Sequence, residues 1–211
     1  MATAPPDQVP PGPDGSREPF AHPFVVALLG LVVLASVAGR FLVRSPLWLD
    51  ESLSVNIARL PLADLPEALR HDGHPPLYYV VLHLWMGLVG EGDGAVRALS
   101  GLISLATVPL AFLAGRRLGG RRVGITLALV FTASPYVLRY GSETRMYSLV
   151  MALVFAGYLL VTAALERPRA STLAGGALVT GALLWTHYWS VWFLATVGLL
   201  LTWRTWRTRR D

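Results

Sequence analysis

The chain has 211 residues, of which 54% are hydrophobic and 15% charged, and its mean hydropathy of +0.51 is too high for an ordinary soluble domain. It contains no cysteine, which excludes disulfides, thiolate metal sites and cysteine nucleophiles. The net charge of +5 comes from 18 arginines against 13 acids. These arginines gather mainly in short clusters between apolar segments, a pattern typical of membrane-protein loops and not of nucleic-acid-binding proteins.

Apolar segments close to the roughly 20 residues that cross a bilayer recur along the chain. They lie at 24–43, 97–115, 122–138, 145–164 and 171–203. The last is long enough for two short helices broken near His187, at about 1.5 Å per residue. Arg40 lies near the end of the first segment, so we expect its side chain to reach the membrane interface. The sequence predicts an all-α, polytopic transmembrane helix bundle of about six spans, without an internal repeat.

The N-terminal segment 1–23 is rich in Pro, Gly and polar residues and has no apolar period. It lacks the basic region next to a short apolar segment that a secretory signal requires. We therefore expect a disordered tail, which the charge pattern described next assigns to the cytoplasm.

The segment 77–89 is apolar and aromatic but only about 13 residues long, a length more typical of interfacial than of spanning helices. If it does not span, the arginine clusters at 116–122, 167–169 and 204–210 all fall on one side of the membrane, which the positive-inside rule assigns to the cytoplasm. The loop 44–96, with three arginines against seven acids, then lies outside. We therefore predict a multi-pass cell-membrane protein with a cytoplasmic N-terminus.

Two short helices are predicted inside this outer loop. Asp64 is followed three residues later by Glu67, which has the form of a capping box before a helix at about 65–70. Within 51–60, three apolar residues share one helical face, which suits a helix on the membrane surface. The three are Leu53, Ile57 and Leu60.

Polar residues from distant parts of the sequence share the predicted outer face. They are Asp50, Glu51, His71, Asp72, His74, Glu143, Arg145 and His187. Carboxylates can take a proton or hold a metal ion, whereas Arg and His can bind a phosphate. Such a group at a bilayer edge suits an enzyme that handles a lipid-borne phosphate.

Each of these residues also has a plainer interpretation. Asp50 and Glu51 can cap the helix that follows them, because acids favour helix N-termini. Glu143 and Arg145 can form an ordinary interfacial ion pair with each other. Taken singly, these residues prove little.

The histidines have plainer interpretations as well. His187, next to Tyr188, can belong to an interfacial aromatic belt. His74 precedes two prolines and can simply open a stiff turn at a helix start. The order of the motifs along the chain is more informative than any one of them.

This ordered set resembles the bacterial family 39 glycosyltransferases of the GT-C superfamily, which include protein O-mannosyltransferases and lipid A aminoarabinose transferases. The resemblance covers about residues 24–203. Its motifs are Trp48-Leu49-Asp50-Glu51, Asp72-Gly73-His74-Pro75-Pro76-Leu77-Tyr78-Tyr79, Gly90-Glu91, Arg97-Ala98-Leu99-Ser100, Ser134-Pro135, Tyr140-Gly141-Ser142-Glu143-Thr144-Arg145-Met146-Tyr147 and Thr186-His187-Tyr188.

The resemblance implies an enzyme that moves a sugar, mannose or a similar hexose, from a polyprenyl-phosphate donor in the membrane to a protein, lipid or glycan acceptor on the non-cytoplasmic face. It implies that Asp50, an acidic residue of the first outer loop, is the catalytic group, with Glu51 beside it. Asp50 would accept the proton of the acceptor hydroxyl or help to hold a divalent metal ion that does so indirectly. No other cofactor is expected.

The same resemblance extends to the substrate-binding residues. It places His74 and Arg145 near the donor phosphate, with Glu143 beside them. His187 and Tyr188 occupy a recurrent family position that we assign to substrate binding.

The resemblance also divides the chain. We expect a tail at 1–23, a GT-C-type transmembrane module at 24–203 and a basic cytoplasmic end at 204–211. Relatives run to several hundred residues, so the chain resembles their N-terminal module alone.

Two other functions stay open at this stage. A non-catalytic assembly module that binds the donor lipid would have the same motifs. A transporter would need ionisable residues at mid-depth in the membrane, and the predicted spans carry few of them.

Overall fold

The computed structural model describes residues 23–208, which form nine helices and no strand. The predicted tail 1–23 lies outside the described residues except for Pro23, as do the last three residues of the predicted basic end. The helices are α1 (Pro23–Phe41), α2 (Leu49–Ala58), α3 (Leu65–Asp72), α4 (Leu77–Val89), α5 (Asp93–Ala133), α6 (Pro135–Gly141), α7 (Tyr147–Glu166), α8 (Ala170–Thr186) and α9 (Ser190–Thr208). The all-α fold class is confirmed.

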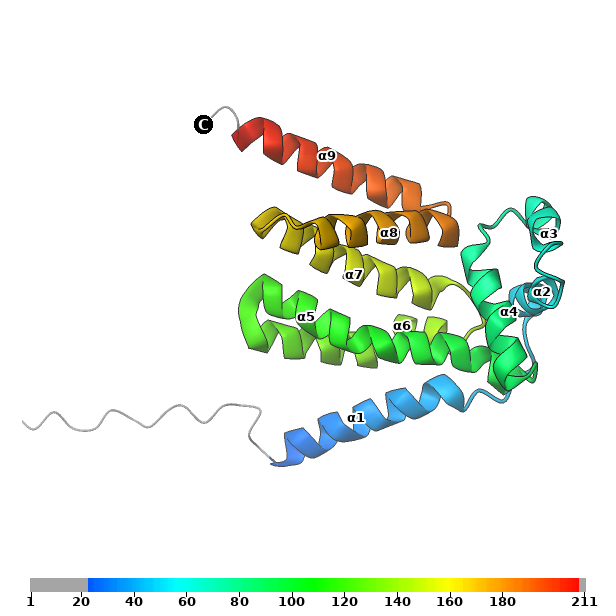
Figure 1. Cartoon of the computed structure of the whole chain (residues 1–211). Coiled ribbons are helices and arrows are strands. Elements are labelled where there is room, and N and C mark those ends of the chain that lie inside the picture. Colours follow the sequence, from blue (N-terminus) through cyan, green and yellow to red (C-terminus); the bar gives the residue numbers. More distant parts are fainter. Residues whose placement is uncertain (1–22, 209–211) are drawn as a thin grey trace, which may run out of the picture.

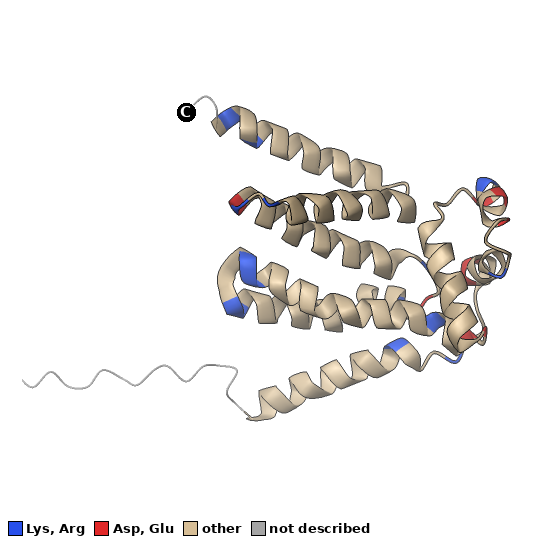
Figure 2. Cartoon of the chain, in the orientation of Figure 1, with Lys and Arg blue, Asp and Glu red and all other residues tan. Residues whose placement is uncertain are grey.

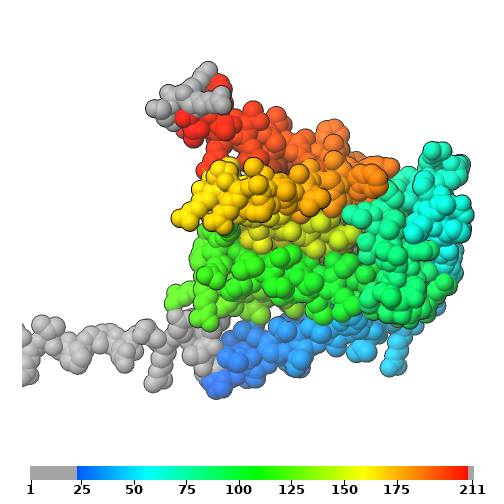
Figure 3. Space-filling model, in the orientation of Figure 1, coloured from blue at the N-terminus to red at the C-terminus, as the bar shows by residue number. Residues whose placement is uncertain are grey.

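The long helices run side by side as a bundle, and α2, α3 and α4 cover one end of it (Figure 1). Figure 3 shows this end cap packed closely against the bundle. Helices α1, α5 and α7 are long and apolar enough to cross a membrane, whereas α4 and α8 are shorter apolar helices. This is the architecture of a helical membrane protein, whose backbone polar groups are satisfied within each helix.

Helix α5 consists of two limbs that fold back on each other, as predicted from the separate segments 97–115 and 122–138. Gly119 and Gly120 break it, and Gly120 has a φ of 81°, a conformation that favours glycine. The limbs touch at Gly115 and Gly124: a Cβ on Gly115 would lie 2.8 Å from the Cα of Gly124. Glycine at both positions allows the backbones to approach closely.

The end cap is built on α4, the segment that was doubtful as a span. Helix α4 crosses the end of the bundle, and Tyr78, Tyr79 and Leu82 on it are fully buried (Figure 1). A hydrophobic cluster joins the cap to the bundle, with members from α2, α4, α5 and the segment before α7: Val55, Ala58, Tyr78, Leu82, Met86, Val96, Leu99 and Met146. Burial of these side chains fixes the cap on the bundle.

Three local predictions about the end cap and α1 are wrong. Arg40 does not reach the interface, because its side chain is fully buried. It donates to Ser104 Oγ at 3.1 Å and to two backbone carbonyls, Ser36 O at 2.6 Å and Thr132 O at 3.2 Å. These acceptors lie inside the bundle, and a buried guanidinium needs such partners. The prediction treated α1 as an isolated helix.

The capping box at Asp64 does not form, because Asp64 has helical φ and ψ and makes no side-chain cap hydrogen bond. Glu67 instead pairs with Arg70 at 2.9 Å. The predicted apolar surface face is also divided: Ile57 is buried against α3 and α4, whereas Leu53 is exposed. Only part of the α2 face that was predicted to meet lipid therefore packs on protein.

Candidate active site

Asp50 and Glu51 are neighbours in the first turn of α2, but their side chains have different surroundings. The Glu51 carboxylate is fully buried, and the Asp50 side chain is 43% exposed. Successive helical residues point about 100° apart, so two adjacent acids cannot face the same way. Glu51 therefore points into the protein interior, whereas the Asp50 carboxylate is accessible from outside.

Glu51 is paired with groups that hold the fold together. Arg97 donates to it twice, from Nε to Oε1 at 2.9 Å and from Nη2 to Oε2 at 2.6 Å. The backbone N–H groups of Thr144 and Trp48 donate to it at 2.8 Å and 3.2 Å. Burial alone would raise the pKa of Glu51, but these hydrogen bonds and the charge of Arg97 outweigh burial and hold it below its ordinary value.

Glu51 therefore ties α2 to two other parts of the chain. Arg97 lies near the start of α5 and also donates to the carbonyls of Ser45 and Pro46 at 2.6 Å and 3.1 Å. The Trp48 contact is the capping interaction that the plainer interpretation of Glu51 predicts. No role was predicted for Arg97, although an arginine one turn into an apolar helix is itself a signal that an acid lies nearby.

Arg145 is brought to Asp50 by the segment between α6 and α7. That segment is held by the Thr144–Glu51 contact and by the Ser100 hydroxyl, which donates to the Arg145 carbonyl at 3.2 Å. The Arg145 guanidinium then lies 3.9 Å from the Asp50 carboxylate and donates to Ser54 Oγ at 3.0 Å. The loop between α6 and α7 therefore positions the Arg145 guanidinium next to the exposed Asp50 carboxylate.

Arg145 is buried with its hydrogen-bonding capacity only partly used. Its side chain is 5% exposed, and among the described residues its Nε has no hydrogen-bond partner. Its Nη2 approaches His74 Nε2 at 3.5 Å, and its guanidinium lies 5.9 Å from the centre of the Tyr147 ring. A buried guanidinium without full pairing is unfavourable unless an anion completes it.

His74 is oriented by Asp72. The Asp72 carboxylate is almost buried, and its Oδ2 lies 2.8 Å from both His74 Nδ1 and the Tyr79 hydroxyl. Gly73, with a φ of 78°, turns the chain so that His74 folds back over Asp72. Because the carboxylate accepts from Nδ1, the Nε2 atom is left to face Arg145.

His187 completes the cluster from the break between α8 and α9. The predicted break is confirmed, and the ring centre of His187 lies 6.0 Å from that of Tyr147. Burial lowers the pKa of His187 from its ordinary value of 6.5, and the charges of His74 and Arg145 lower it further. The structure thus brings Asp50, His74, Arg145 and His187 together from four separate parts of the sequence.

Two other predicted site residues lie apart from this cluster. Glu143 pairs with Arg139 at 2.9 Å, so the simple Glu143–Arg145 ion pair does not form. Tyr188 is 60% exposed and lies among other exposed aromatic side chains, as the aromatic-belt interpretation predicts: Trp185, Trp189 and Trp192. Their roles in substrate binding stay predictions.

Metal binding at Asp50 has no support in the donor set. Within residues 23–208 no three His, Asp or Glu side chains are grouped as metal ligands. The Arg145 guanidinium lies 3.9 Å from the Asp50 carboxylate and would repel a divalent cation. We therefore derive no step through a metal ion.

The fold and the cluster define a helical membrane protein with a cationic, partly buried site at one end of its bundle. The chain belongs to the dolichyl-phosphate-mannose-protein mannosyltransferase family, whose model matches residues 73–210. It is thus a membrane glycosyltransferase of the GT-C type, as the motif resemblance implied. The match includes His74, Arg145 and His187 and begins after Asp50. Searches of curated proteins and of solved structures found no match.

Proposed function

We propose that the chain transfers a hexose from a polyprenyl-phosphate donor to an acceptor hydroxyl, with Asp50 as the general base. The observation that carries this proposal is the buried, incompletely paired Arg145 beside the exposed Asp50 carboxylate. A phosphate would supply the missing anion, and a guanidinium is well suited to bind it. Family membership supports the reaction class.

In the proposed reaction the Asp50 carboxylate takes the proton of the acceptor hydroxyl. The hydroxyl oxygen then attacks the anomeric carbon, and the bond from that carbon to the phosphate oxygen breaks. The bonding electrons leave with the polyprenyl phosphate, whose added negative charge Arg145 stabilises. His74 would add to this only in its imidazolium form, in which Nε2 also carries a proton and can donate to the phosphate. The products are the glycosylated acceptor, polyprenyl phosphate and a protonated Asp50.

Asp72 has a positioning role in this proposal. It holds Nδ1 of His74, which directs Nε2 to the place where the phosphate would lie. His187, whose lowered pKa keeps it neutral near pH 7, would add a hydrogen bond without a second fixed charge. Glu51 and Arg97 hold the loop that carries Arg145, so we assign them a structural role.

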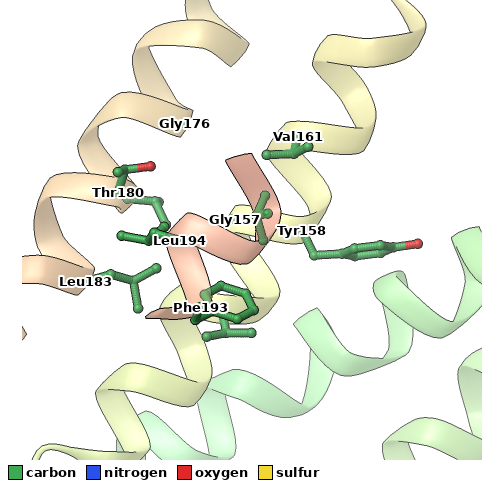
Figure 4. Close-up of a pocket in the computed structure, with 11 residues that line it drawn as sticks. Gly157, Tyr158, Val161, Gly176, Thr180, Leu183, Phe193 and Leu194 are labelled. Atoms are coloured by element: carbon green, nitrogen blue, oxygen red, sulfur yellow. The ribbon is translucent and has the colours of Figure 1, made fainter. Parts of the chain in front are cut away.

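The polyprenyl chain of the donor needs an apolar surface. An apolar cavity of about 250 Å³ lies between α7, α8 and α9, and Gly157, Gly176, Leu183 and Phe193 are among the residues that line it (Figure 4). It is built from the helices whose ends carry Tyr147 and His187. We propose that it accepts part of the isoprenoid chain.

The charge distribution supports a sidedness for the reaction. Arginines gather at the end of the bundle opposite the cap, at the turn within α5 and at the α7–α8 connection (Figure 2). The positive-inside rule would assign that end to the cytoplasm and the candidate site to the outer face. We propose this orientation, with the N-terminus inside.

The test is sugar transfer by the full chain in membranes supplied with labelled polyprenyl-phosphate mannose. We expect Asp50→Asn to lower transfer to protein and lipid acceptors by about 100-fold or more, the usual contribution of a general base. Donor binding should persist in this variant and fall in Arg145→Gln. Asp64→Asn, which removes an exposed acid that starts α3, is the matched control.

Two outcomes would overturn the proposal. Unchanged transfer by Asp50→Asn would remove Asp50 from the chemistry. Donor binding by the wild type without transfer to any protein, lipid or glycan fraction would favour the assembly-module function instead.

A further inference from the structure

An open pocket lies at the end of the bundle opposite the candidate active site. We name it the arginine pocket; its volume is about 420 Å³ and it is lined by Arg117, Ala163, Glu166, Arg167, Arg169 and Thr172. These residues come from the first limb of α5, the end of α7, the connection to α8 and the first turn of α8. Figure 2 shows the charged side of this end.

The arginine pocket has more positive than negative charge. Arg117 donates to Thr162 Oγ1 at 2.8 Å and to Glu166 Oε1 at 3.2 Å, so the one acid of the pocket is already paired. No ion pair within residues 23–208 involves Arg167 or Arg169. Two guanidinium groups therefore line the pocket without an acidic partner there, which favours an anionic ligand.

The surroundings of the pocket indicate that this anion carries an apolar chain. A second open pocket shares Arg117 and is lined by Leu113, Arg116 and Leu159. Leu113 is 41% exposed, and both α5 and α7 are long and apolar enough to cross a membrane. If α5 and α7 cross the membrane, the arginines would lie at the level of the lipid headgroups, with the leucines on the membrane side.

We propose that the arginine pocket binds the phosphate of an anionic phospholipid, whose acyl chain lies along Leu113 and Leu159. A free phosphate would use the arginines and leave the leucines uncovered. Because the pocket bridges α5, α7 and α8, a lipid bound only by the folded state would stabilise the contact between these helices. The site is separate from the donor site at the other end of the bundle.

The test measures lipid binding by the purified full chain, with native mass spectrometry and thermal unfolding as readouts. The probes are phosphatidylglycerol, phosphatidylcholine and inorganic phosphate. The pocket variant is Arg167→Gln with Arg169→Gln. The matched control, Arg121→Gln with Arg204→Gln, removes the same charge from exposed positions outside the pocket.

We expect the wild type to retain phosphatidylglycerol over phosphatidylcholine and to gain thermal stability from it. The pocket variant should bind it about tenfold more weakly, because two charge-assisted contacts are lost, while the control stays near the wild type. Equal losses in both variants would show diffuse attraction and overturn the proposal. So would equal retention of both lipids, or equal stabilisation by inorganic phosphate. The single variant Arg169→Gln keeps the test valid if the double variant does not fold.

Discussion

The guanidinium of Arg97 donates two hydrogen bonds to the carboxylate of Glu51, from a position 46 residues further along the chain. Both side chains are buried, and Glu51 also accepts from the backbone of Thr144. One acid therefore holds together α2, the start of α5 and the loop before α7. That loop carries Arg145, so the geometry of the candidate site depends on this buried pair.

We predict that breaking this pair on one side is costly. Glu51→Gln leaves the Arg97 charge buried without a counter-charge, and such changes cost about 3–5 kcal/mol. The free energy of unfolding in detergent measures it. Arg59→Gln, which breaks the exposed pair with Glu91, is the matched control and should cost no more than about 1 kcal/mol.

A double-mutant cycle with Glu51→Gln and Arg97→Leu completes this test. The double variant should be more stable than the sum of the two single losses implies, because neither side chain is then left as an uncompensated charge. Strictly additive losses would contradict the pairing.

A second prediction concerns acid stability. The pKa of Glu51 is lowered in the folded chain, so its ionised form contributes stability above the ordinary value of 4.5. This contribution is lost as the pH falls through the lowered folded pKa. Unfolding measured between pH 7 and pH 3 should therefore show a steeper loss of stability in the wild type than in Glu51→Gln. Equal slopes would mean that Glu51 is not held ionised.

A third prediction concerns the His74 tautomer. With Asp72 in place, the neutral ring should carry its proton on Nδ1, and Asp72→Asn should weaken this preference. Nitrogen NMR of labelled histidine distinguishes the two tautomers. We also expect the variant to lower turnover by about 10-fold or more, because His74 Nε2 would no longer be held toward Arg145.

The control for Asp72 is Tyr79→Phe. It removes the other hydrogen bond to the same carboxylate oxygen and leaves the contact with His74. If Tyr79→Phe and Asp72→Asn changed the His74 tautomer equally, orientation by Asp72 would be refuted.

A fourth prediction uses His187 as a reporter of the bound anion. In the free chain its pKa lies below 6.5, chiefly because of burial and also because of the charges of His74 and Arg145. Polyprenyl phosphate should raise this pKa, since a nearby anion favours the protonated ring. Proton NMR titration follows the change. A pKa that stays the same with saturating lipid would place the phosphate elsewhere.

The sequence was sufficient for the helical class, the two limbs of α5 and the break near His187, because the length and spacing of apolar runs are local signals. It was insufficient for Arg40, since an arginine at a helix end has the same pattern whether it faces lipid or the bundle interior. Asp64 shows a related limit: the capping box needs an extended N-cap, whereas the Asp64 backbone is helical. Side-chain surroundings depend on neighbours that are distant in sequence.

In the candidate site, too, the surroundings of a side chain depend on residues that are distant in the sequence. The motif order brought Asp50, His74, Arg145 and His187 to attention, and the fold places them together. It named Asp50 as the catalytic group, but it could not show that Glu51, the next residue on α2, is buried and paired with Arg97. Nor did it assign a role to Arg97, whose partner is far away in the chain.

The close contact of Gly115 with Gly124 bears on how the chain enters a membrane. The second limb of α5, after Gly120, has about 13 residues up to Ala133, or roughly 20 Å of helix, which is less than the ~30 Å of a bilayer core. Alone it would make a poor membrane anchor. Packed against the first limb, it can be inserted as a helical hairpin whose arginine-bearing turn remains on the side of the membrane from which insertion begins. Insertion of the second limb would then depend on the backbone contact between Gly115 and Gly124. Gly115→Leu would abolish this contact, so insertion would fail before the candidate site at the other end of the bundle forms.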